Sequence, residues 1–193
     1  MIQSGKFDSP VMDIKKLANS LLIFTIKRLI EIFGVIISCL GILLLISLVS
    51  YSPTDPNFIF PEKTQIENIL GPQGSYISDL FLQSVGLVAY LIPLTYIFTG
   101  INIFRRKEIF LFIENSFFTI LYILVGSLFF SFYYKNAYTL YINGNGGFVG
   151  NYLNLIFLND TLIFNEKIIY FIFIFLIIAI FFISINFNIK NFT

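Results

Sequence analysis

Four long stretches of this chain carry no charged residue and consist almost wholly of apolar side chains. They run from Ile32 to Val49, from Leu80 to Phe104, from Asn115 to Tyr134 and from Ile168 to Ile185. A helix needs about 20 apolar residues to cross the hydrocarbon core of a bilayer. A lone strand would leave its backbone unpaired in lipid, and the polar alternation of barrel strands is missing. The runs therefore predict an all-α integral membrane protein, a bundle of four transmembrane helices.

These runs divide the chain into a tail, a membrane domain and two loops. We expect residues 29–189 to form the membrane domain and residues 1–28 to form a cytoplasmic N-terminal tail. In the tail, Leu17, Leu21 and Phe24 share a helical spacing with Arg28. This pattern fits either an amphipathic helix lying at the membrane surface or an extension of the first span. The predicted spans are about 29–51, 80–104, 112–134 and 167–187, and the predicted outer loops are 52–79 and 135–166.

The amino-acid composition limits which catalytic, metal and nucleic-acid sites the chain can form. Of the 193 residues 57% are hydrophobic and 12% are charged, whereas soluble domains carry about 25% charged residues. The chain has no His and one Cys, which disfavours metal sites and Cys/His or Ser/His nucleophile pairs. The net charge of +1 gives no basic field for nucleic acid. We therefore expect no catalytic residue, no metal, no cofactor and no direct contact with DNA, and we expect Cys39 to be a small buried apolar residue.

The basic residues predict the orientation in the membrane, because cytoplasmic loops of membrane proteins carry an excess of Lys and Arg. Three of the 12 basic residues fall on the predicted outer side, namely Lys63, Lys135 and Lys167. The other nine fall on the opposite side: Lys6, Lys15, Lys16, Lys27, Arg28, Arg105, Arg106, Lys107 and Lys190. Both termini are therefore expected in the cytoplasm. At this boundary Glu31 has Lys27 and Arg28 one helical turn before it, which predicts a local ion pair.

The stretch "SYSPTDPNF" ends the first apolar run. Pro53 has no backbone N–H and disfavours helical geometry in the residue before it. Ser at the first position and Pro at the second position are typical of a β-turn. Asp55 and Pro56 extend the break, since Asp side chains often bond to nearby backbone. This segment is either only a turn at the outer surface or a binding epitope.

A longer series of residues follows this turn. Within the second run Gly86, Ala89 and Pro93 predict close packing against a neighbouring helix, with a kink at Pro93. That packing is either within one chain or between subunits, and Gly34 and Gly41 of the first run suit similar packing. The whole series comprises Asn68, Gly71, Gly74, Asp79, Gly86, Ala89, Tyr90 and Pro93, then Gly146, Gly147 and Gly150 in "GGFVGNYL".

This ordered series, with four spans, resembles the N-terminal four-helix membrane domain of the FtsK/SpoIIIE DNA translocase family. The resemblance extends from about Lys27 to about Asn188. It implies a multi-pass protein of the bacterial inner membrane at the division septum, which anchors a cytoplasmic ATPase motor acting in chromosome segregation. It also implies a homo-oligomer, a hexamer in that family, and contacts with membrane proteins of the division machinery.

The sequence departs from the full-length family pattern in one respect. The motor needs a phosphate-binding loop of the form G-x-x-x-x-G-K-[ST], and no Gly-Lys pair here is followed by Ser or Thr. We therefore expect no motor domain and no ATP hydrolysis in these residues. The alternative function is a small transporter or channel subunit. No charged residue lies at mid-span, but an oligomer could line a pore with Ser84, Thr95 or Asn102.

Overall fold

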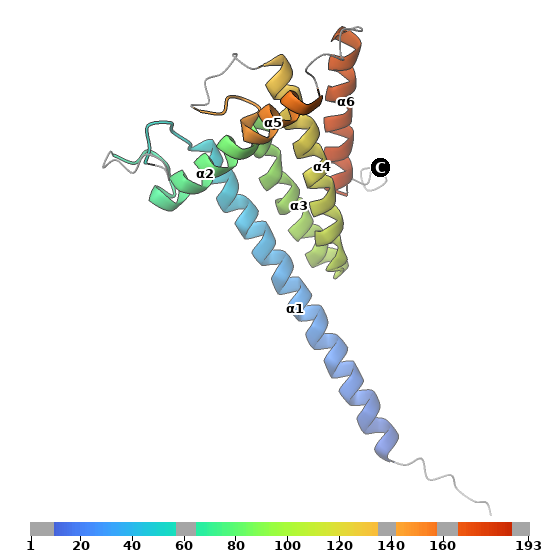
Figure 1. The fold of residues 1–193 in the computed structure, drawn as a ribbon. Coiled ribbons are helices and arrows are strands. Elements are labelled where there is room, and N and C mark those ends of the chain that lie inside the picture. The colour runs from blue at the N-terminus through green and yellow to red at the C-terminus, as the bar shows by residue number, and fades with distance from the viewer. Residues whose placement is uncertain (1–9, 57–64, 135–141, 158–165, 187–193) are drawn as a thin grey trace, which may run out of the picture.

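The computed structural model describes residues 10–56, 65–134, 142–157 and 166–186, with side chains from residue 14 onward. These residues form helices and no strand (Figure 1). Four segments are long and apolar enough to cross a membrane, which confirms the predicted fold class. The elements are α1 (Pro10–Val49), α2 (Gly71–Val85), the 3-10 helix η1 (Gly86–Tyr90), α3 (Leu91–Arg106), α4 (Phe110–Tyr133), α5 (Gly147–Phe157) and α6 (Glu166–Ser184).

Helix α1 is continuous over 40 residues, which corresponds to about 60 Å of helix, twice the thickness of the hydrocarbon core. Residues 10–28 of the predicted tail therefore continue the first membrane helix. Figure 1 shows this N-terminal half projecting beyond the other helices. Cys39 lies on an exposed face of α1, so the prediction that it is buried was wrong. Its apolar surroundings come from neighbours along the helix and not from a core.

The second apolar run is bent and does not form one straight helix. Helix α2 lies across one end of the bundle, and α3 runs away from that end along α1 (Figure 1). The bend is at Gly86, whose φ of 72° suits glycine and strains other residues. Pro93, where we predicted the kink, lies in the first turn of α3, where its missing N–H costs no helical hydrogen bond. Together η1 and α3 span about 34 Å.

The short helices and the basic turn of the protein therefore lie at two opposite ends of the bundle. Helices α2 and α5 lie at one end, which we call the polar end (Figure 1). The turn between α3 and α4 lies toward the other end, and α6 runs in that direction but stops short of the turn. We call this the basic end, because it carries Arg28, Arg105, Arg106 and Lys107. Four residues used to predict the orientation, Lys6, Lys63, Lys135 and Lys190, lie outside the described residues.

Close backbone approach joins α1 to α3. A Cβ atom added to Gly34 would lie 2.7 Å from the carbonyl oxygen of Gly100, and one added to Gly41 would lie 3.0 Å from that of Pro93. The predicted packing role of Gly34 and Gly41 is thus confirmed within one chain. The apolar core of the bundle forms beyond this contact, toward the polar end, from Leu48, Leu82, Val88, Ala89, Ile92 and Tyr122.

Candidate functional site at the polar end of the bundle

The turn after α1 is held by the buried carboxylate of Asp55. One oxygen accepts a hydrogen bond from the backbone N–H of Glu67 at 2.8 Å, and the other accepts from that of Asn68 at 2.9 Å. The backbone N–H of Asp55 donates to the carbonyl of Ser52 at 3.2 Å, which closes the predicted turn around Pro53. Asp55 is only 4% exposed. It therefore joins two ends of a loop, and most of its surface is hidden from any partner.

Asn68 continues this arrangement toward α1. Its side-chain amide donates to the carbonyl oxygens of Ser47 at 2.9 Å and Ser50 at 3.2 Å. Its own side-chain oxygen accepts from the backbone N–H of Leu70 at 3.0 Å. The last carbonyl groups of a helix lack partners within the helix, so Asn68 serves as the cap that α1 itself does not contain.

Helix α2 then packs onto the same turn through small residues. The Ser47 hydroxyl donates to the carbonyl of Gly74 at 2.6 Å, and the Ser75 hydroxyl donates to that of Pro56 at 2.7 Å. A Cβ atom at Gly74 would lie 2.6 Å from the Cβ of Leu70. The structure thus brings Asp55, Pro56, Asn68 and Gly74, which lie up to 19 residues apart in sequence, into one cluster.

Asp79 links this cluster to the second loop. Its Oδ1 accepts from the hydroxyl of Tyr51 at 3.3 Å and from the amide of Gln83 at 3.4 Å. Gln83 in turn accepts from the backbone N–H of Asn143 at 3.2 Å. Burial, with the neighbouring Asp79 carboxylate, raises the pKa of Tyr51 to about 12. Tyr51, which lies beyond the end of α1, therefore stays protonated and can donate to Asp79 at neutral pH.

The bend at Gly86 is held in place by Asn145 and by Gly147, the first residue of α5. The carbonyl of Asn145 accepts from the backbone N–H of Leu87 at 2.9 Å. A Cβ atom at Gly86 would lie 1.9 Å from that same oxygen, and one at Gly147 would lie 2.5 Å from the nitrogen of Gly86. A side chain at Gly86 or Gly147 would push the two backbones apart. The loop before α5 thus fixes the angle between α2 and α3.

Gly146, just before α5, and Gly150 within α5 approach α4 in the same way. Cβ atoms at Gly146 and Gly150 would lie 2.6 and 2.2 Å from the carbonyl oxygen of Ser127. The hydroxyl of Ser127 donates to the carbonyl of Val85 at 2.8 Å, and Ser131 donates to Asn151 at 2.9 Å. Two serines on one face of α4, Ser127 and Ser131, therefore bind both α5 and the end of α2.

The remaining predicted residues have separate positions. Pro53 is exposed in the turn, and Gly71 begins α2 with φ 67° and no atom near its would-be Cβ. Ala89 is fully buried in the core. The hydroxyl of Tyr90 donates to the carbonyl of Leu48 at 3.1 Å. Pro93 lies below the polar end, against Gly41.

Sequence reasoning missed the serines and amides that connect these residues. One signal was available, since polar residues recur three or four positions apart within apolar runs, which places them on one helix face. The missed residues are Ser47, Ser50, Ser75, Ser78, Gln83, Ser127, Ser131, Asn143 and Asn145. Gln83 follows Asp79 by four positions on α2, but its bond to Asn143, and the contacts of Asn143 and Asn145, join separate segments and have no local pattern.

The chemistry of this site is structural. Within the described ranges no three His, Cys, Asp or Glu side chains come together as a metal site would need. The polar groups bond to backbone and to one another, and so hold a bent helix and two loops in place. Polar residues deeper in the bundle behave alike: Thr95 contacts Tyr122 at 3.1 Å and Ser184 at 3.2 Å. Asn102 donates to the carbonyl of Ile185 at 3.0 Å. Thr95 and Asn102 therefore join α6 to α3, which does not favour the channel alternative.

Comparison with known proteins assigns this architecture to a family. A family model of the 4TM region of DNA translocase FtsK/SpoIIIE matches residues 26–192. The DNA translocase FtsK of Shewanella oneidensis is 32% identical over 133 residues, which cover 65% of this chain and 14% of that protein. That of Azospirillum brasilense is 31% identical over 88 residues, 45% of this chain and 14% of the relative. That of Caulobacter vibrioides is 37% identical over 69 residues, 36% of this chain and 8% of the relative.

No solved structure matches this chain significantly. The chain spans only a small part of the length of these curated relatives, 14% or less. The matched range of the family model begins within α1 and includes the other three membrane-spanning segments, α2 to α3, α4 and α6. The chain belongs to the family of the four-transmembrane region of FtsK/SpoIIIE DNA translocases.

Proposed function

We propose that this chain is the membrane anchor of a DNA translocase that acts in chromosome segregation and cell division. The observation that carries the proposal is the family match over residues 26–192, which covers the larger part of the first candidate membrane span and all of the other three. The relatives are DNA translocases of which the matched part is a small fraction. The ATP-driven step would belong to a cytoplasmic motor, and the chain would hold that motor at the inner membrane of the septum.

The charge distribution supports an orientation with the basic end in the cytoplasm. Arg28 lies on α1, and Arg105, Arg106 and Lys107 lie at the turn between α3 and α4. Cytoplasmic segments next to membrane spans carry such an excess of Lys and Arg. Since α1 starts and α6 ends toward this end (Figure 1), both chain ends would be cytoplasmic, and a motor attached to either end would be on the side of the DNA.

We propose further that the polar end meets membrane proteins of the division machinery, and that the anchor acts as a homo-oligomer, a hexamer by family resemblance. Support comes from α5, which exposes apolar side chains beside the polar cluster. Phe148 and Tyr152 are 63% and 57% exposed, and their rings stack at 6.3 Å. Exposed aromatic residues beside a rigid polar surface are typical of contact sites.

The proposal is tested by supplying the anchor to a motor that lacks one. The 193 residues would replace the membrane region of a bacterial FtsK-type translocase carrying a fluorescent tag. The expected result is fluorescence at the septum and rescue of chromosome segregation. The control is the same motor on an unrelated four-helix anchor, which should give an even membrane signal. Even membrane fluorescence from the first fusion, at equal protein level, would contradict the septal role.

Contacts at the polar end are tested separately by site-specific photocrosslinking. A photoreactive residue at Phe148 on α5 should give crosslinks to division proteins. The same residue at Phe175, which is 71% exposed on α6, is the matched control on a membrane-spanning surface. If both positions give the same products, the contact with division proteins at α5 is not supported, while anchoring of the motor is unaffected.

A further inference from the structure

A groove beside α1 combines an apolar wall with a charged rim. It has a volume of about 260 Å³ and is lined by Arg28, Glu31, Ile32, Val35, Ile36 and Phe104. We call these six residues the basic groove. Ile32, Val35, Ile36 and Phe104 are between 48% and 56% exposed, and they belong to helices that cross the membrane. The wall therefore offers an apolar surface to a ligand that already lies in the bilayer.

The rim of the groove is built around one acidic residue. Each oxygen of Glu31 binds one cation, Oε2 the Arg28 guanidinium at 2.5 Å and Oε1 the Lys107 ammonium at 2.8 Å. The ion pair that the sequence predicted with Arg28 is present, but the second partner is Lys107 from the α3–α4 turn and not Lys27. One carboxylate between two cations leaves one positive charge in excess.

Both cations keep hydrogen-bond donors free to face outward. Arg28 carries five N–H donors and Lys107 carries three, while each makes one contact with Glu31. Their side chains are 56% and 39% exposed. The guanidinium also lies 5.0 Å from the centre of the Phe24 ring, which helps to fix its position. Arg105 and Arg106, both exposed, add positive charge at the same end, against the exposed acid Glu108.

A ligand that satisfies this site must carry an anionic head beside an apolar chain. We propose that the basic groove binds an anionic glycerophospholipid, with a phosphate at Arg28 and Lys107 and an acyl chain along Ile32, Val35 and Phe104. Basic pockets at helix boundaries bind such headgroups in other membrane proteins. Charge complementarity favours an anion, and the apolar wall favours an anion that carries an acyl chain over a soluble one. Glu31 is a positioning residue that holds both cations at the rim.

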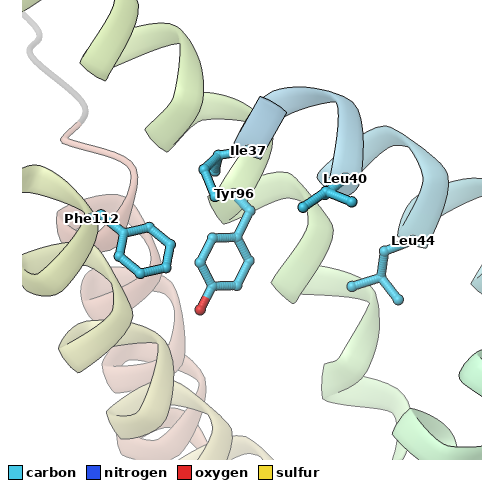
Figure 2. A pocket seen from close by; sticks show the side chains of 6 residues that line it. Ile37, Leu40, Leu44, Tyr96 and Phe112 are labelled. Carbon is cyan, nitrogen blue, oxygen red and sulfur yellow. The ribbon is translucent and has the colours of Figure 1, made fainter. Parts of the chain in front are cut away.

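A second pocket in the bundle provides an internal comparison. It has a volume of about 220 Å³ between α1, α3 and α4 and carries no charged residue in its lining of Ile37, Leu40, Gly41, Leu44, Tyr96 and Phe112. Figure 2 shows Tyr96 and Phe112 facing each other across from Leu40 and Leu44. The ring centres of Tyr96 and Phe112 are 5.9 Å apart. This pocket should accept lipid chains without regard to the headgroup.

The test uses the absence of Trp from the sequence. Phe104→Trp places a single fluorophore in the basic groove, and Phe112→Trp places one in the uncharged pocket. Each variant is reconstituted in vesicles of phosphatidylcholine with increasing fractions of brominated phosphatidylglycerol or brominated phosphatidylcholine, which quench Trp on contact. We expect brominated phosphatidylglycerol to bind about fivefold more strongly than brominated phosphatidylcholine at position 104, the factor that one basic residue contributes at an anionic surface. At position 112 we expect no preference.

Variants that change the charge of single residues identify which residue causes the preference for the anionic lipid. In the Phe104→Trp background, Arg28→Gln should reduce the preference to about one, and Arg28→Lys should keep it. Lys15→Gln removes a charge from the projecting part of α1 and should leave the preference unchanged. Equal quenching by both lipids at position 104 would overturn the proposal, as would a preference that survives Arg28→Gln. Weak quenching by both lipids that increases as protein is diluted would assign the groove to a second copy of the chain.

Discussion

The side-chain amide of Asn68 donates to the backbone carbonyl of Ser47 at 2.9 Å, across 21 residues of sequence. This bond ends the first membrane helix with a residue that comes from the loop leading to α2. The same side chain is 4% exposed, so water cannot readily replace it. The loop therefore stabilises the end of α1 when it folds onto it.

Replacing Asn68 by Ala should destabilise the polar end. The carbonyls of Ser47 and Ser50 would lose the Asn68 amide as donor, which leaves Ser47 with only a long contact of 3.5 Å from the Ser50 hydroxyl. A buried polar group without a partner costs about 1 to 3 kcal/mol. We expect about 2 kcal/mol in reversible unfolding measured in mixed detergent micelles. Gln65→Ala, at an exposed position three residues earlier, is the control and should have little effect. Equal unfolding curves for both variants would show that Asn68 does not cap α1.

Replacing Asp55 by Ala distinguishes a structural residue from a binding epitope. Its carboxylate accepts from two backbone N–H groups, and hydrogen bonds to a charged group contribute about 1.5 to 3 kcal/mol each. We expect Asp55→Ala to lower the yield of monodisperse protein in size-exclusion chromatography, with Asp55→Asn intermediate because one acceptor oxygen remains. A normal yield and normal stability, with loss of a partner, would instead identify Asp55 as an epitope.

Two glycines with positive φ give a matched pair. Gly71 and Gly86 have φ of 67° and 72°, and a left-handed φ costs other residues about 1 to 2 kcal/mol. Gly86 also has ψ of −151°, which places it in a region that is essentially restricted to glycine, with a cost of about 1 to 3 kcal/mol for other residues. At Gly71 no atom lies within 4 Å of a would-be Cβ, but at Gly86 the Asn145 oxygen lies 1.9 Å away.

Gly71→Ala should therefore cost about 1 to 2 kcal/mol. Gly86→Ala should cost about 3 kcal/mol or more, because overpacking against the Asn145 loop adds to a larger backbone strain. Thermal unfolding of the two purified variants measures the difference between their losses of stability. Similar losses for both would mean that the contact between the bend and the loop before α5 contributes nothing.

Thr95 and Ser184 provide a test of the attachment of α6. Their hydroxyl groups lie 3.2 Å apart and are fully buried. Hydrogen bonds between membrane helices contribute about 0.6 kcal/mol on average and about 1.7 kcal/mol at most. A double-mutant cycle with Thr95→Val and Ser184→Ala should give a coupling energy in that range. A coupling energy of zero would mean that this bond contributes nothing to the attachment of α6, which would then rest on apolar packing and on the hydrogen bonds at its two ends.

The membrane fold followed directly from local sequence. Runs without charge that are long enough to cross a bilayer predict helices, because hydrocarbon leaves the backbone no other partner. The turn at Pro53 was predictable for a similar reason, since proline acts on its own and the preceding residue. The glycines were predicted as packing residues, but not the surfaces that they approach.

Other features depended on residues distant in sequence. Glu31 has Lys27 and Arg28 within one helical turn, yet its second cation is Lys107, which the α3–α4 turn brings to 2.8 Å. The bend predicted at Pro93 is at Gly86, because the Asn145 loop fills the space beside that glycine. Neither outcome has a local signal.

The sequence by itself determined the number and positions of the apolar helices, the turn after the first of them and the separation of charge between the ends. These are properties of short segments, set by hydropathy, backbone restrictions and charge counts. Only the tertiary structure decided that α2 lies across the bundle, that Asn68 caps α1 and that the Gly86 bend fits the loop before α5. Those features arise from hydrogen bonds and close contacts between segments tens of residues apart, whose geometry exists only after the helices have packed.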